Sequence, residues 1–274
     1  MQIDSHQHFW RLDRGDYAWL TPALAPIYRD FGPEDLEPLL RRYRITGSVL
    51  VQAAASVAET DYLLGLAANS AFVQAVVGWV DFESSEAPGE VDRLAMSPKL
   101  KGLRPMIQDI PDREWMLRST VGPAVARMQH IGLSFDALLK PQHLAPFRQF
   151  LELYPDLAVV IDHGAKPSIA SGQFGDWAEE MREIARDPRV HCKISGLVTE
   201  ARAQWRKEEL TRYLDLLVEI FGPARLMWGS DWPVVELAGG YERWREASLD
   251  YLARLSEAER AAILGGTASA FYRL

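Results

Sequence analysis

Residues 158–163 read Ala-Val-Val-Ile-Asp-His, an apolar, β-branched run that ends in two polar side chains. Near-continuous apolar runs of this length are typical of strands in a parallel sheet covered by helices. The same pattern recurs along the chain and predicts eight strands, over Gln2–His8, Ser48–Ala53, Val73–Asp81, Leu100–Gln108, Leu133–Leu139, Ala158–His163, Val190–Ser195 and Arg225–Ser230.

The segments between these runs have apolar residues three and four apart, a spacing typical of amphipathic helices. One such segment extends from Leu210 to Phe221 and is followed by Gly222-Pro223, a helix stop. Another carries Leu36, Leu39, Leu40 and Tyr43. Eight strand–helix units predict an α/β protein with a closed (β/α)₈ TIM barrel. A doubly wound open sheet is the alternative, but no Gly-x-Gly-x-x-Gly pattern follows the first strand and fewer strands would be expected.

Length and composition favour one domain that binds a small molecule. The 274 residues match one barrel without a linker, so residues 1–274 are expected to form a single domain. A net charge of −8 without a basic cluster argues against nucleic acid or an anionic membrane as partner. Cys192 is the only cysteine, which excludes an intramolecular disulfide and a multi-thiolate metal site. Without a signal sequence or an apolar run of membrane length, we expect a cytoplasmic protein; the oligomeric state has no sequence signal.

His6 and His8 are one residue apart at the end of the first predicted strand. Side chains at positions i and i+2 share a strand face, so the two imidazoles converge. In a barrel of this kind, active sites lie at the carboxyl ends of the strands. His163 ends the sixth predicted strand and Asp231 follows the eighth, so these four residues are expected to meet. The other histidines are expected to be structural, because they do not end a predicted strand. His130 precedes the fifth strand, His191 is at the start of the seventh, and His143 lies a few residues beyond the fifth, where a helix is expected to begin.

Three imidazoles and one carboxylate suit either of two chemistries. They match the ligands of a single catalytic zinc ion. They also match a metal-free site in which histidines stabilise an oxyanion and Asp231 takes a proton from an attacking water. A free aspartate has a pKa near ~3.9, and burial beside Trp232 or an apolar wall is expected to raise it. The structural alternative for Asp231 is that it caps the turn after the eighth strand.

Other polar residues near strand ends predict a substrate-binding layer. The candidates are Gln52, Arg104, Gln108, Lys166 and Trp232. The guanidinium of Arg104 can hold a carbonyl or carboxylate through two hydrogen bonds. Tryptophans suit stacking on a sugar-like ring, for which Trp10, Trp79 and Trp232 are candidates. This combination of polar side chains and tryptophans favours a polyhydroxylated or carboxylated small molecule as the substrate.

Five motifs resemble the sugar-lactonase branch of the amidohydrolase superfamily, of the amidohydrolase 2 type. They are Ile-Asp-Ser-His-Gln-His-Phe-Trp at 3–10, Lys-Gly-Leu-Arg-Pro-Met-Ile-Gln-Asp at 101–109, Val-Ile-Asp-His-Gly-Ala-Lys-Pro at 160–167, Cys-Lys-Ile-Ser-Gly-Leu-Val-Thr-Glu at 192–200 and Trp-Gly-Ser-Asp-Trp-Pro at 228–233. The resemblance covers nearly the whole chain. It is greatest to L-fuconolactonases, with L-rhamnonolactonases near and pyrone-dicarboxylate lactonases more distant.

The resemblance implies a distorted barrel in which His6, His8, His163 and Asp231 form the catalytic centre. Water would open an aldonolactone, such as L-fucono- or L-rhamnono-lactone, to the aldonic acid, a step of carbohydrate catabolism such as L-fucose degradation. The alternatives are a metal-dependent decarboxylase of the same superfamily, a pyrone- or muconolactone-type lactonase, and a non-catalytic barrel that binds a sugar acid.

The resemblance also bears on the cofactor. Many amidohydrolases hold two metals through a modified lysine on strand four and histidines on strands five and six. Here strand four ends in Arg104 and Gln108, and strand five carries Asp136 without a strand-end histidine, so two metals are not expected. Either no metal is required, or one optional zinc or manganese ion is held by His6, His8 and Asp231.

Overall fold

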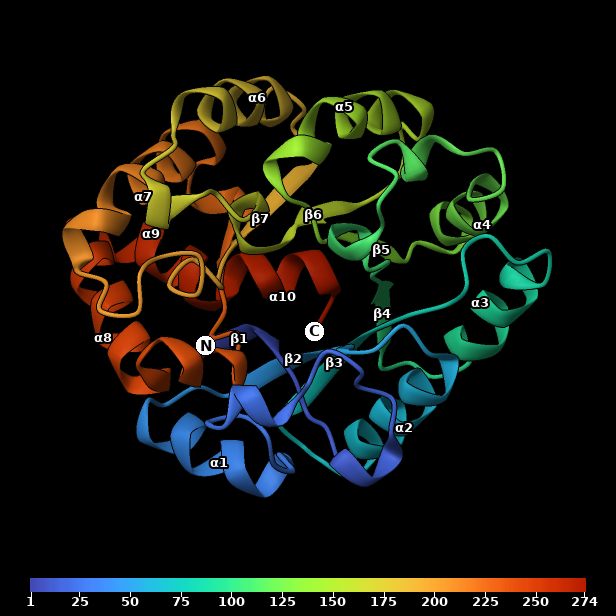
Figure 1. Ribbon diagram of the computed structural model, residues 1–274, viewed down its shortest axis with the longest axis horizontal. Helices are drawn as coiled ribbons and strands as arrows, with labels where there is room; N and C mark the ends of the chain where they lie inside the picture. The colour runs from blue at the N-terminus through green and yellow to red at the C-terminus, as the bar shows by residue number, and fades with distance from the viewer.

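Eight parallel strands pair in chain order in the computed structural model, which describes residues 1–274. They form a ring surrounded by helices, as Figure 1 shows, and confirm the predicted (β/α)₈ barrel. The strands are β1 (Ile3–Gln7), β2 (Gly47–Val51), β3 (Val73–Gly78), β4 (Leu100–Leu103), β5 (Ser134–Ala137), β6 (Val159–Ile161), β7 (Val190–Ile194) and β8 (Leu226–Trp228).

All eight strands end earlier than predicted, and the boundaries differ mainly at these carboxyl ends. The prediction for the fourth strand extended to Gln108, whereas β4 ends at Leu103 and a short 3₁₀ turn covers Ile107–Asp109. Likewise β6 ends at Ile161, and residues Asp162–Ala165 form a turn. The polar residues beyond the strands lie at the barrel mouth, and some keep a backbone hydrogen bond to the neighbouring strand, such as Arg104 N–H to the Gly78 carbonyl at 2.8 Å.

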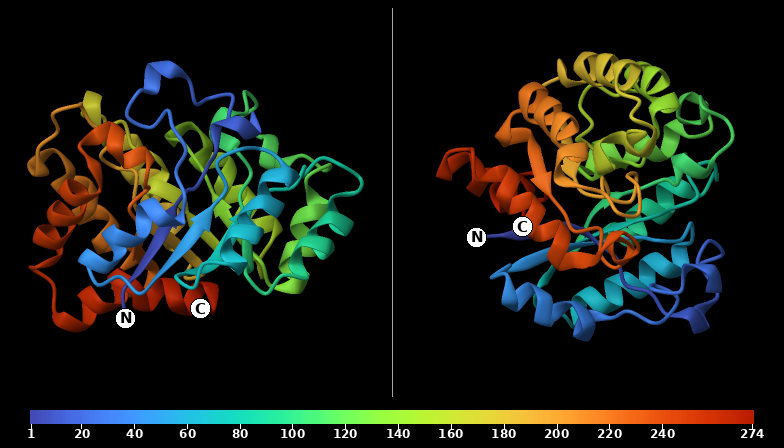
Figure 2. Two further views of the ribbon diagram at one scale, coloured as in Figure 1. Left: turned by 90° about the horizontal axis from the view of Figure 1, so that it is seen from below. Right: turned by 60° about the vertical axis from the view of Figure 1, so that its left-hand side comes forward.

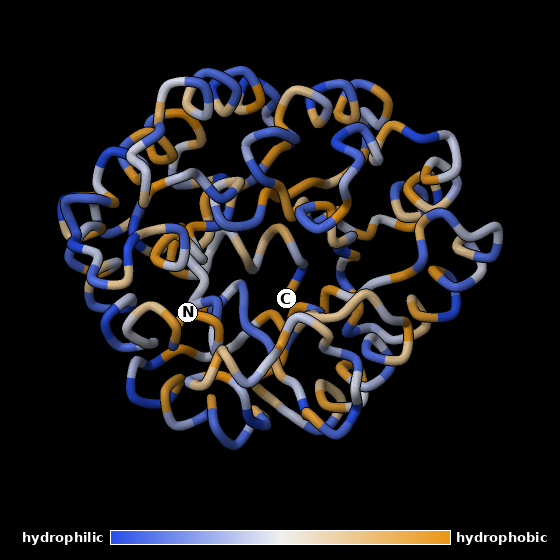
Figure 3. The backbone as a smooth tube through the Cα atoms, in the orientation of Figure 1, coloured by the Kyte–Doolittle hydropathy of each residue, from blue (hydrophilic) through white to orange (hydrophobic).

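Seven helices lie between the strands and three follow β8, and all of them except α9 contain buried residues. They are α1 (Pro33–Arg42), α2 (Val57–Ala68), α3 (Ala87–Ala95), α4 (Gly122–Ile131), α5 (Leu144–Leu153), α6 (Gly175–Ala185), α7 (Lys207–Phe221), α8 (Gly240–Leu252), α9 (Glu257–Ala261) and α10 (Thr267–Tyr272). The predicted stop after α7 is confirmed, because Gly222 has φ of 65° and its N–H bonds to the Val218 carbonyl. Hydrophobic and hydrophilic segments alternate along these helices in Figure 3, as expected for elements packed on a core.

The two ends of the barrel are closed differently. The short helix α10 lies across the end at which both termini are found, opposite the excursion that follows β1 (Figure 2). Within α10, Tyr272 is buried and its hydroxyl donates to Asp136 at 2.5 Å. At the other end, residues 11–30 form a loop whose base is held by paired backbone hydrogen bonds between Trp10 and Phe31, of 2.9 and 3.0 Å. The mouth beneath that loop is therefore the accessible end.

Ring closure joins the two strands that are furthest apart in sequence. The N–H of Asp231 donates to the His6 carbonyl at 2.8 Å, and the N–H of His8 donates to the Trp232 carbonyl at 2.7 Å. Ser230 immediately precedes Asp231, and its N–H donates to the Asp4 carboxylate at 2.8 Å. We call these contacts the β1–β8 seam.

None of the helices combines the length and the apolar character needed to cross a membrane.

Gly229 lies at this seam because there is no room for a side chain. A Cβ atom built there would lie 2.7 Å from His6 Cβ and 3.0 Å from the His6 backbone nitrogen. We predict that Gly229→Ala lowers the free energy of unfolding by about 1–3 kcal/mol, because the seam must open to admit a methyl group. Chemical denaturation followed by circular dichroism measures this change.

Gly65→Ala is the matched control, since Gly65 is exposed within α2 and a Cβ atom there meets nothing within 4 Å. That variant is expected to be as stable as the wild type or more stable by ~0.4–1 kcal/mol. Equal stability of Gly229→Ala and wild type would contradict the account of the seam.

Candidate active site

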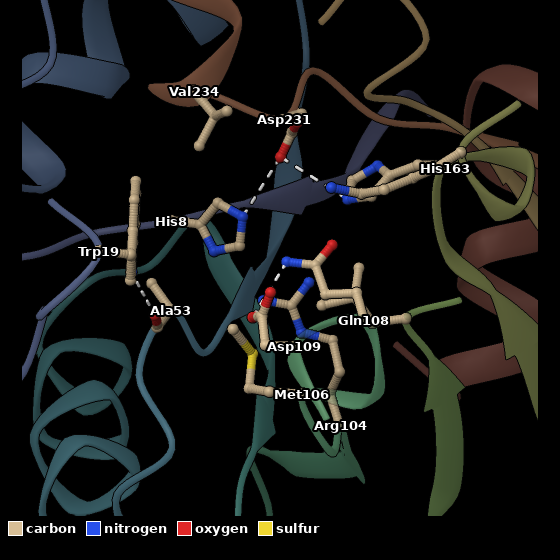
Figure 4. Close-up of a pocket in the computed structure, with 12 residues that line it drawn as sticks. His8, Trp19, Ala53, Arg104, Met106, Gln108, Asp109, His163, Asp231 and Val234 are labelled. Carbon is tan, nitrogen blue, oxygen red and sulfur yellow. Dashed lines mark hydrogen bonds and ion pairs between the residues drawn. The ribbon is translucent and has the colours of Figure 1, made fainter. Parts of the chain in front are cut away.

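A cavity of about 270 Å³ opens at the barrel mouth. Six of the residues predicted for catalysis or binding line it, as Figure 4 shows for most of them: His8, Arg104, Gln108, His163, Lys166 and Asp231. The volume lies just below the usual range of ~300–1,000 Å³ for ligand sites, which favours a small substrate.

Three imidazoles surround one carboxylate oxygen at the cavity floor. The Nε2 atoms of His8, His6 and His163 lie 3.3, 3.8 and 3.9 Å from Asp231 Oδ1. His6 itself is fully buried beneath the lining residues, whereas the other three side chains line the cavity. The structure thus brings together the four residues predicted from strand ends.

Unusual backbone conformations direct these side chains inward. His163 and Asp231 both have positive φ, of 56° and 60°. At His163 this conformation turns the chain so that Asp162 and His163, although consecutive, both contribute to the barrel interior. The ring of His163 packs on Gly196, where a Cβ atom would lie only 2.4 Å from Nδ1. Strain of this kind at a strand end is a mark of functional sites.

Each imidazole is oriented by a partner at its second nitrogen. His8 Nδ1 lies 2.8 Å from the Val51 carbonyl, which can only accept, so this nitrogen donates. His163 Nδ1 lies 2.9 Å from Ser195 Oγ, and His6 Nδ1 lies 3.3 Å from Asp162 Oδ1. Side-chain orientation at the site is therefore set before any substrate binds.

Burial and neighbouring charge determine the protonation of the site. Burial lowers the pKa of His163 to about 4 and that of His6 well below its ordinary value, so both rings are neutral at pH 7. For Asp231, burial alone would raise the pKa, but His163 and the hydrogen bond from His8 outweigh it and hold that pKa below its usual range. The expectation that burial raises the Asp231 pKa is therefore wrong, and the carboxylate is ionised.

The turn after β8 does not depend on the Asp231 side chain. Ser230 Oγ accepts a hydrogen bond from the Trp232 N–H at 3.0 Å. Asp231 contributes only its backbone carbonyl, which accepts from the Val235 N–H at 2.9 Å. The turn-capping alternative for the Asp231 carboxylate is therefore not supported, and that carboxylate faces the imidazoles.

Two predicted substrate contacts do not line the cavity. Gln52 is fully buried, and its amide nitrogen donates to the Arg104 carbonyl at 2.7 Å. Trp232 is also buried, with its ring centroid 5.1 Å from that of Phe31 and 6.1 Å from that of Phe9. Both expectations are corrected. Gln52 supports the backbone of Arg104 through a hydrogen bond, and Trp232 packs against the base of the loop over residues 11–30.

The remaining candidates are placed as follows. Arg104 is held at the floor by Asp162, 3.3 Å away, and by the Gln52 carbonyl. Lys166 lies 3.6 Å from Glu200, and Gln108 presents a buried amide oxygen without a protein partner. The histidines expected to be structural, His130, His143 and His191, do not line the cavity.

Sequence reasoning missed six lining residues, which are Trp19, Ala53, Met106, Asp109, Leu138 and Val234. Trp19 is the largest, and its indole N–H donates to the Ala53 carbonyl at 2.8 Å, which fixes the ring beside His8 (Figure 4). It comes from the loop over residues 11–30, which has neither helical nor strand periodicity. Only the length of that excursion after the first strand could have indicated a functional loop.

The donor set fits one divalent metal ion. Ligand atoms of His6, His163 and Asp231 all lie within 4.8 Å of one another. Zinc–ligand bonds of about 2.0–2.1 Å require these atoms to move slightly inward on binding. This group shares His6 and Asp231 with the predicted set of His6, His8 and Asp231, and His8 Nε2 also lies 3.3 Å from Asp231 Oδ1.

The fold and the site together define a barrel hydrolase, and comparison with known proteins identifies its family. Residues 3–274 match the amidohydrolase family, and the chain belongs to it. It is 44% identical to an L-fucono-1,5-lactonase of Burkholderia ambifaria, with 100% of this chain and 96% of that protein covered. A second L-fucono-1,5-lactonase, from Burkholderia multivorans, is 38% identical, with 100% and 96% covered.

A solved structure shows the same fold. A crystallised amidohydrolase from Burkholderia multivorans with bound zinc is 37% identical and superposes with a TM-score of 0.94, with 100% of this chain and 99% of that chain covered. The predicted resemblance to the amidohydrolase superfamily is confirmed.

The mutually close group of His6, His163 and Asp231 generates a binding prediction. We expect isothermal titration calorimetry to detect one zinc ion per wild-type chain, because three donors already converge. His163→Asn should abolish that binding, whereas His8→Asn should retain it. The reverse order of the two variants, or no zinc binding to the wild type, would contradict the assignment.

Proposed function

We propose that this protein hydrolyses an L-fucono-1,5-lactone or a closely similar aldonolactone to its aldonic acid. The observation that carries the proposal is the convergence of three imidazole nitrogens on Asp231 Oδ1 at 3.3–3.9 Å, at the floor of a small cavity. The same chain is 44% and 38% identical to two L-fucono-1,5-lactonases over its full length. Such a reaction would belong to L-fucose degradation.

Asp231 is the proposed general base. Its carboxylate is ionised at neutral pH and is held at the cavity floor by His8. A water molecule beside Oδ1 loses a proton to Asp231 as its oxygen attacks the lactone carbonyl carbon. Asp231 then returns this proton to the ring oxygen when the carbon–oxygen bond breaks. A depressed pKa makes this carboxylate a weak base, which suffices because a lactone is an activated ester.

His163 and Arg104 are the proposed stabilisers of the oxyanion. The Ser195 hydroxyl can donate to His163 Nδ1, which leaves a proton on Nε2 that faces the cavity floor. Arg104 adds a fixed positive charge that needs no reorganisation during the reaction. His8 Nε2 lies 3.3 Å from Asp231 Oδ1.

His6, His163 and Asp231 would hold a divalent metal ion if one is bound. Such an ion polarises a carbonyl oxygen and lowers the pKa of water. A coordinating carboxylate and neutral imidazoles are the protonation states found at this site.

The cavity walls suit a deoxy sugar ring. Polar groups for hydroxyl recognition come from Gln108, Asp109 and Lys166. Trp19, with Met106 and Val234, offers apolar surface. Gln108 lines the cavity, and its buried amide oxygen has no protein partner. This combination of polar and apolar walls favours a polyhydroxylated ring with an apolar substituent. The decarboxylase and pyrone-lactonase alternatives are not favoured, since both close relatives act on an aldonolactone by name.

The test of the base is Asp231→Asn. We expect its kcat on L-fucono-1,5-lactone to fall by ~10²–10⁴-fold, because an amide cannot accept the water proton. A pH-indicator assay across L- and D-aldonolactones, with and without chelator, measures the loss and ranks the substrates. Asp81→Asn is the control: Asp81 is an exposed carboxylate outside the cavity. Near-wild-type rates of Asp231→Asn on every lactone that the native protein hydrolyses would refute the role.

The test of the loop is Trp19→Ala. We expect KM to rise about tenfold with little change in kcat, because the indole contributes binding surface but no chemistry. Tyr28→Ala removes another half-exposed aromatic ring of the same loop that does not line the cavity, and should leave KM unchanged. An equal effect of both substitutions would mean that the loop, not the indole, is responsible.

A further inference from the structure

Two consecutive peptide units, Gln52–Ala53 and Ala53–Ala54, hold two of the cavity side chains. The Gln52 carbonyl accepts a hydrogen bond from the guanidinium of Arg104, and the Ala53 carbonyl accepts one from the indole N–H of Trp19 at 2.8 Å. Arg104 and Trp19 both line the cavity, although they come from separate segments of the chain. The placement of both side chains therefore depends on where these two carbonyls point.

The N–H groups of the same two peptide units donate to one buried carboxylate. Glu59 has no exposed surface and lies in the first turn of α2. Its Oε1 and Oε2 atoms are 3.0 and 3.1 Å from the Ala53 nitrogen, and Oε2 is 2.8 Å from the Ala54 nitrogen. Each peptide unit therefore joins Glu59 on one side to a cavity side chain on the other.

Ordinary helix capping does not explain these contacts. In a capping box, a glutamate at the third helical position accepts a hydrogen bond from the N–H of the N-cap residue. Ser56 is the N-cap of α2, but its N–H donates to the Ala54 carbonyl at 3.0 Å. The Glu59 carboxylate extends past it to the residues that follow β2. It is therefore aimed at the segment that holds Arg104 and Trp19.

The charge of this carboxylate bears on the strength of these contacts. Burial raises the pKa of Glu59 to about 7, whereas the two backbone N–H groups and the positive charge of Arg104 favour the ionised form. The carboxylate is therefore the main form at about pH 8. A buried carboxylate polarises the peptide units that donate to it, which strengthens the hydrogen bonds that their carbonyls accept.

We propose that Glu59 is a positioning residue that fixes the peptide units of residues 52–54 and, through them, the guanidinium of Arg104 and the indole of Trp19. The consequence for catalysis rests on the proposed lactone hydrolysis, in which Arg104 stabilises the oxyanion and Trp19 offers binding surface. Glu59 itself does not line the cavity, so it touches no substrate. Its effect on the two side chains does not depend on which substrate is used.

The first experiment observes the Trp19 indole in Glu59→Gln at about pH 8, without any substrate. A glutamine has one acceptor oxygen, so its NH₂ group would face one of the backbone N–H groups. In protein labelled with ¹⁵N-tryptophan, the Trp19 indole signal is the one missing from Trp19→Ala. We expect this signal to shift in Glu59→Gln and its hydrogen exchange to become about tenfold faster. The indole of Trp228, which donates to Ser248 far from this segment in sequence, should give an unchanged signal.

Thr60→Val is the matched control. Thr60 is the next residue of α2 and is equally buried. Its hydroxyl donates to the Trp79 carbonyl at 3.0 Å and accepts from the Trp79 N–H at 2.8 Å. The variant loses buried hydrogen bonds in the same turn, so we expect it to be less stable than the wild type. It should nevertheless keep the Trp19 signal, because residues 52–54 keep their contacts with Glu59.

The second experiment measures lactone hydrolysis. We expect kcat of Glu59→Gln on L-fucono-1,5-lactone to fall ~10–100-fold, because Arg104 loses its fixed position. KM should rise by no more than the increase of about tenfold expected for Trp19→Ala. When Glu59→Gln is added to Trp19→Ala, kcat should still fall but KM should not rise further, since the indole is already absent. Thr60→Val should keep the wild-type kcat and KM.

The outcomes separate positioning from stability. Circular dichroism confirms that each variant is folded. Glu59→Asp keeps the charge with a shorter reach; it replaces Glu59→Gln if that variant does not fold, and the same Trp19 shift is expected. An unchanged Trp19 signal or kcat in the folded Glu59 variant, or an equal shift in Thr60→Val, would refute the positioning role. Failure of both Glu59 variants to fold would assign Glu59 to stability instead. A wild type inactive on every lactone, with the expected Trp19 response, would refute only the lactonase proposal.

Discussion

The β1–β8 seam is the contact on which the site depends. Its two backbone hydrogen bonds, Asp231 N–H to His6 C=O at 2.8 Å and His8 N–H to Trp232 C=O at 2.7 Å, place the carboxylate opposite both histidines. Gly229 permits the close approach, since a larger residue would meet His6. Because each of these residues lies at a strand end, the contacts that close the ring also bring the site residues together.

Buried charge is the second constraint on this barrel. Lys193, Asp136 and Asp162 lie in its interior with no exposed surface, and Arg104 is nearly as buried. Burying ions costs desolvation energy, and pairing them seldom recovers more than that energy. A stabilising role is therefore a weak explanation for the cluster. Orientation of Arg104 is a better one, since its guanidinium donates to Asp162 at 3.3 Å and a low-dielectric interior makes hydrogen bonds to a carboxylate strong.

The accuracy of the sequence-based site prediction follows from strand geometry. His6, His8, His163 and Asp231 were predicted because parallel strands bring their carboxyl ends to one edge. That rule gives the height of a residue along the barrel axis, but it does not say whether the side chain points into the cavity. Gln52 is at the right level yet bonds to the Arg104 backbone, and Trp232 turns away from the carboxylate beside it. Trp19 was missed because a loop without periodicity has no position on a strand.

Local sequence alone determined the eight strands, the helices between them, the (β/α)₈ architecture and the four residues at the mouth. Apolar periodicity and the order of the strands can both be read directly from the sequence. Tertiary structure decided which side chains face the cavity and which pair beneath it. It brought ligand atoms of His6, His163 and Asp231 within 4.8 Å of one another and joined Asp162 to Lys193. These relations join residues far apart in sequence, and their angles depend on backbone turns such as the positive φ at His163.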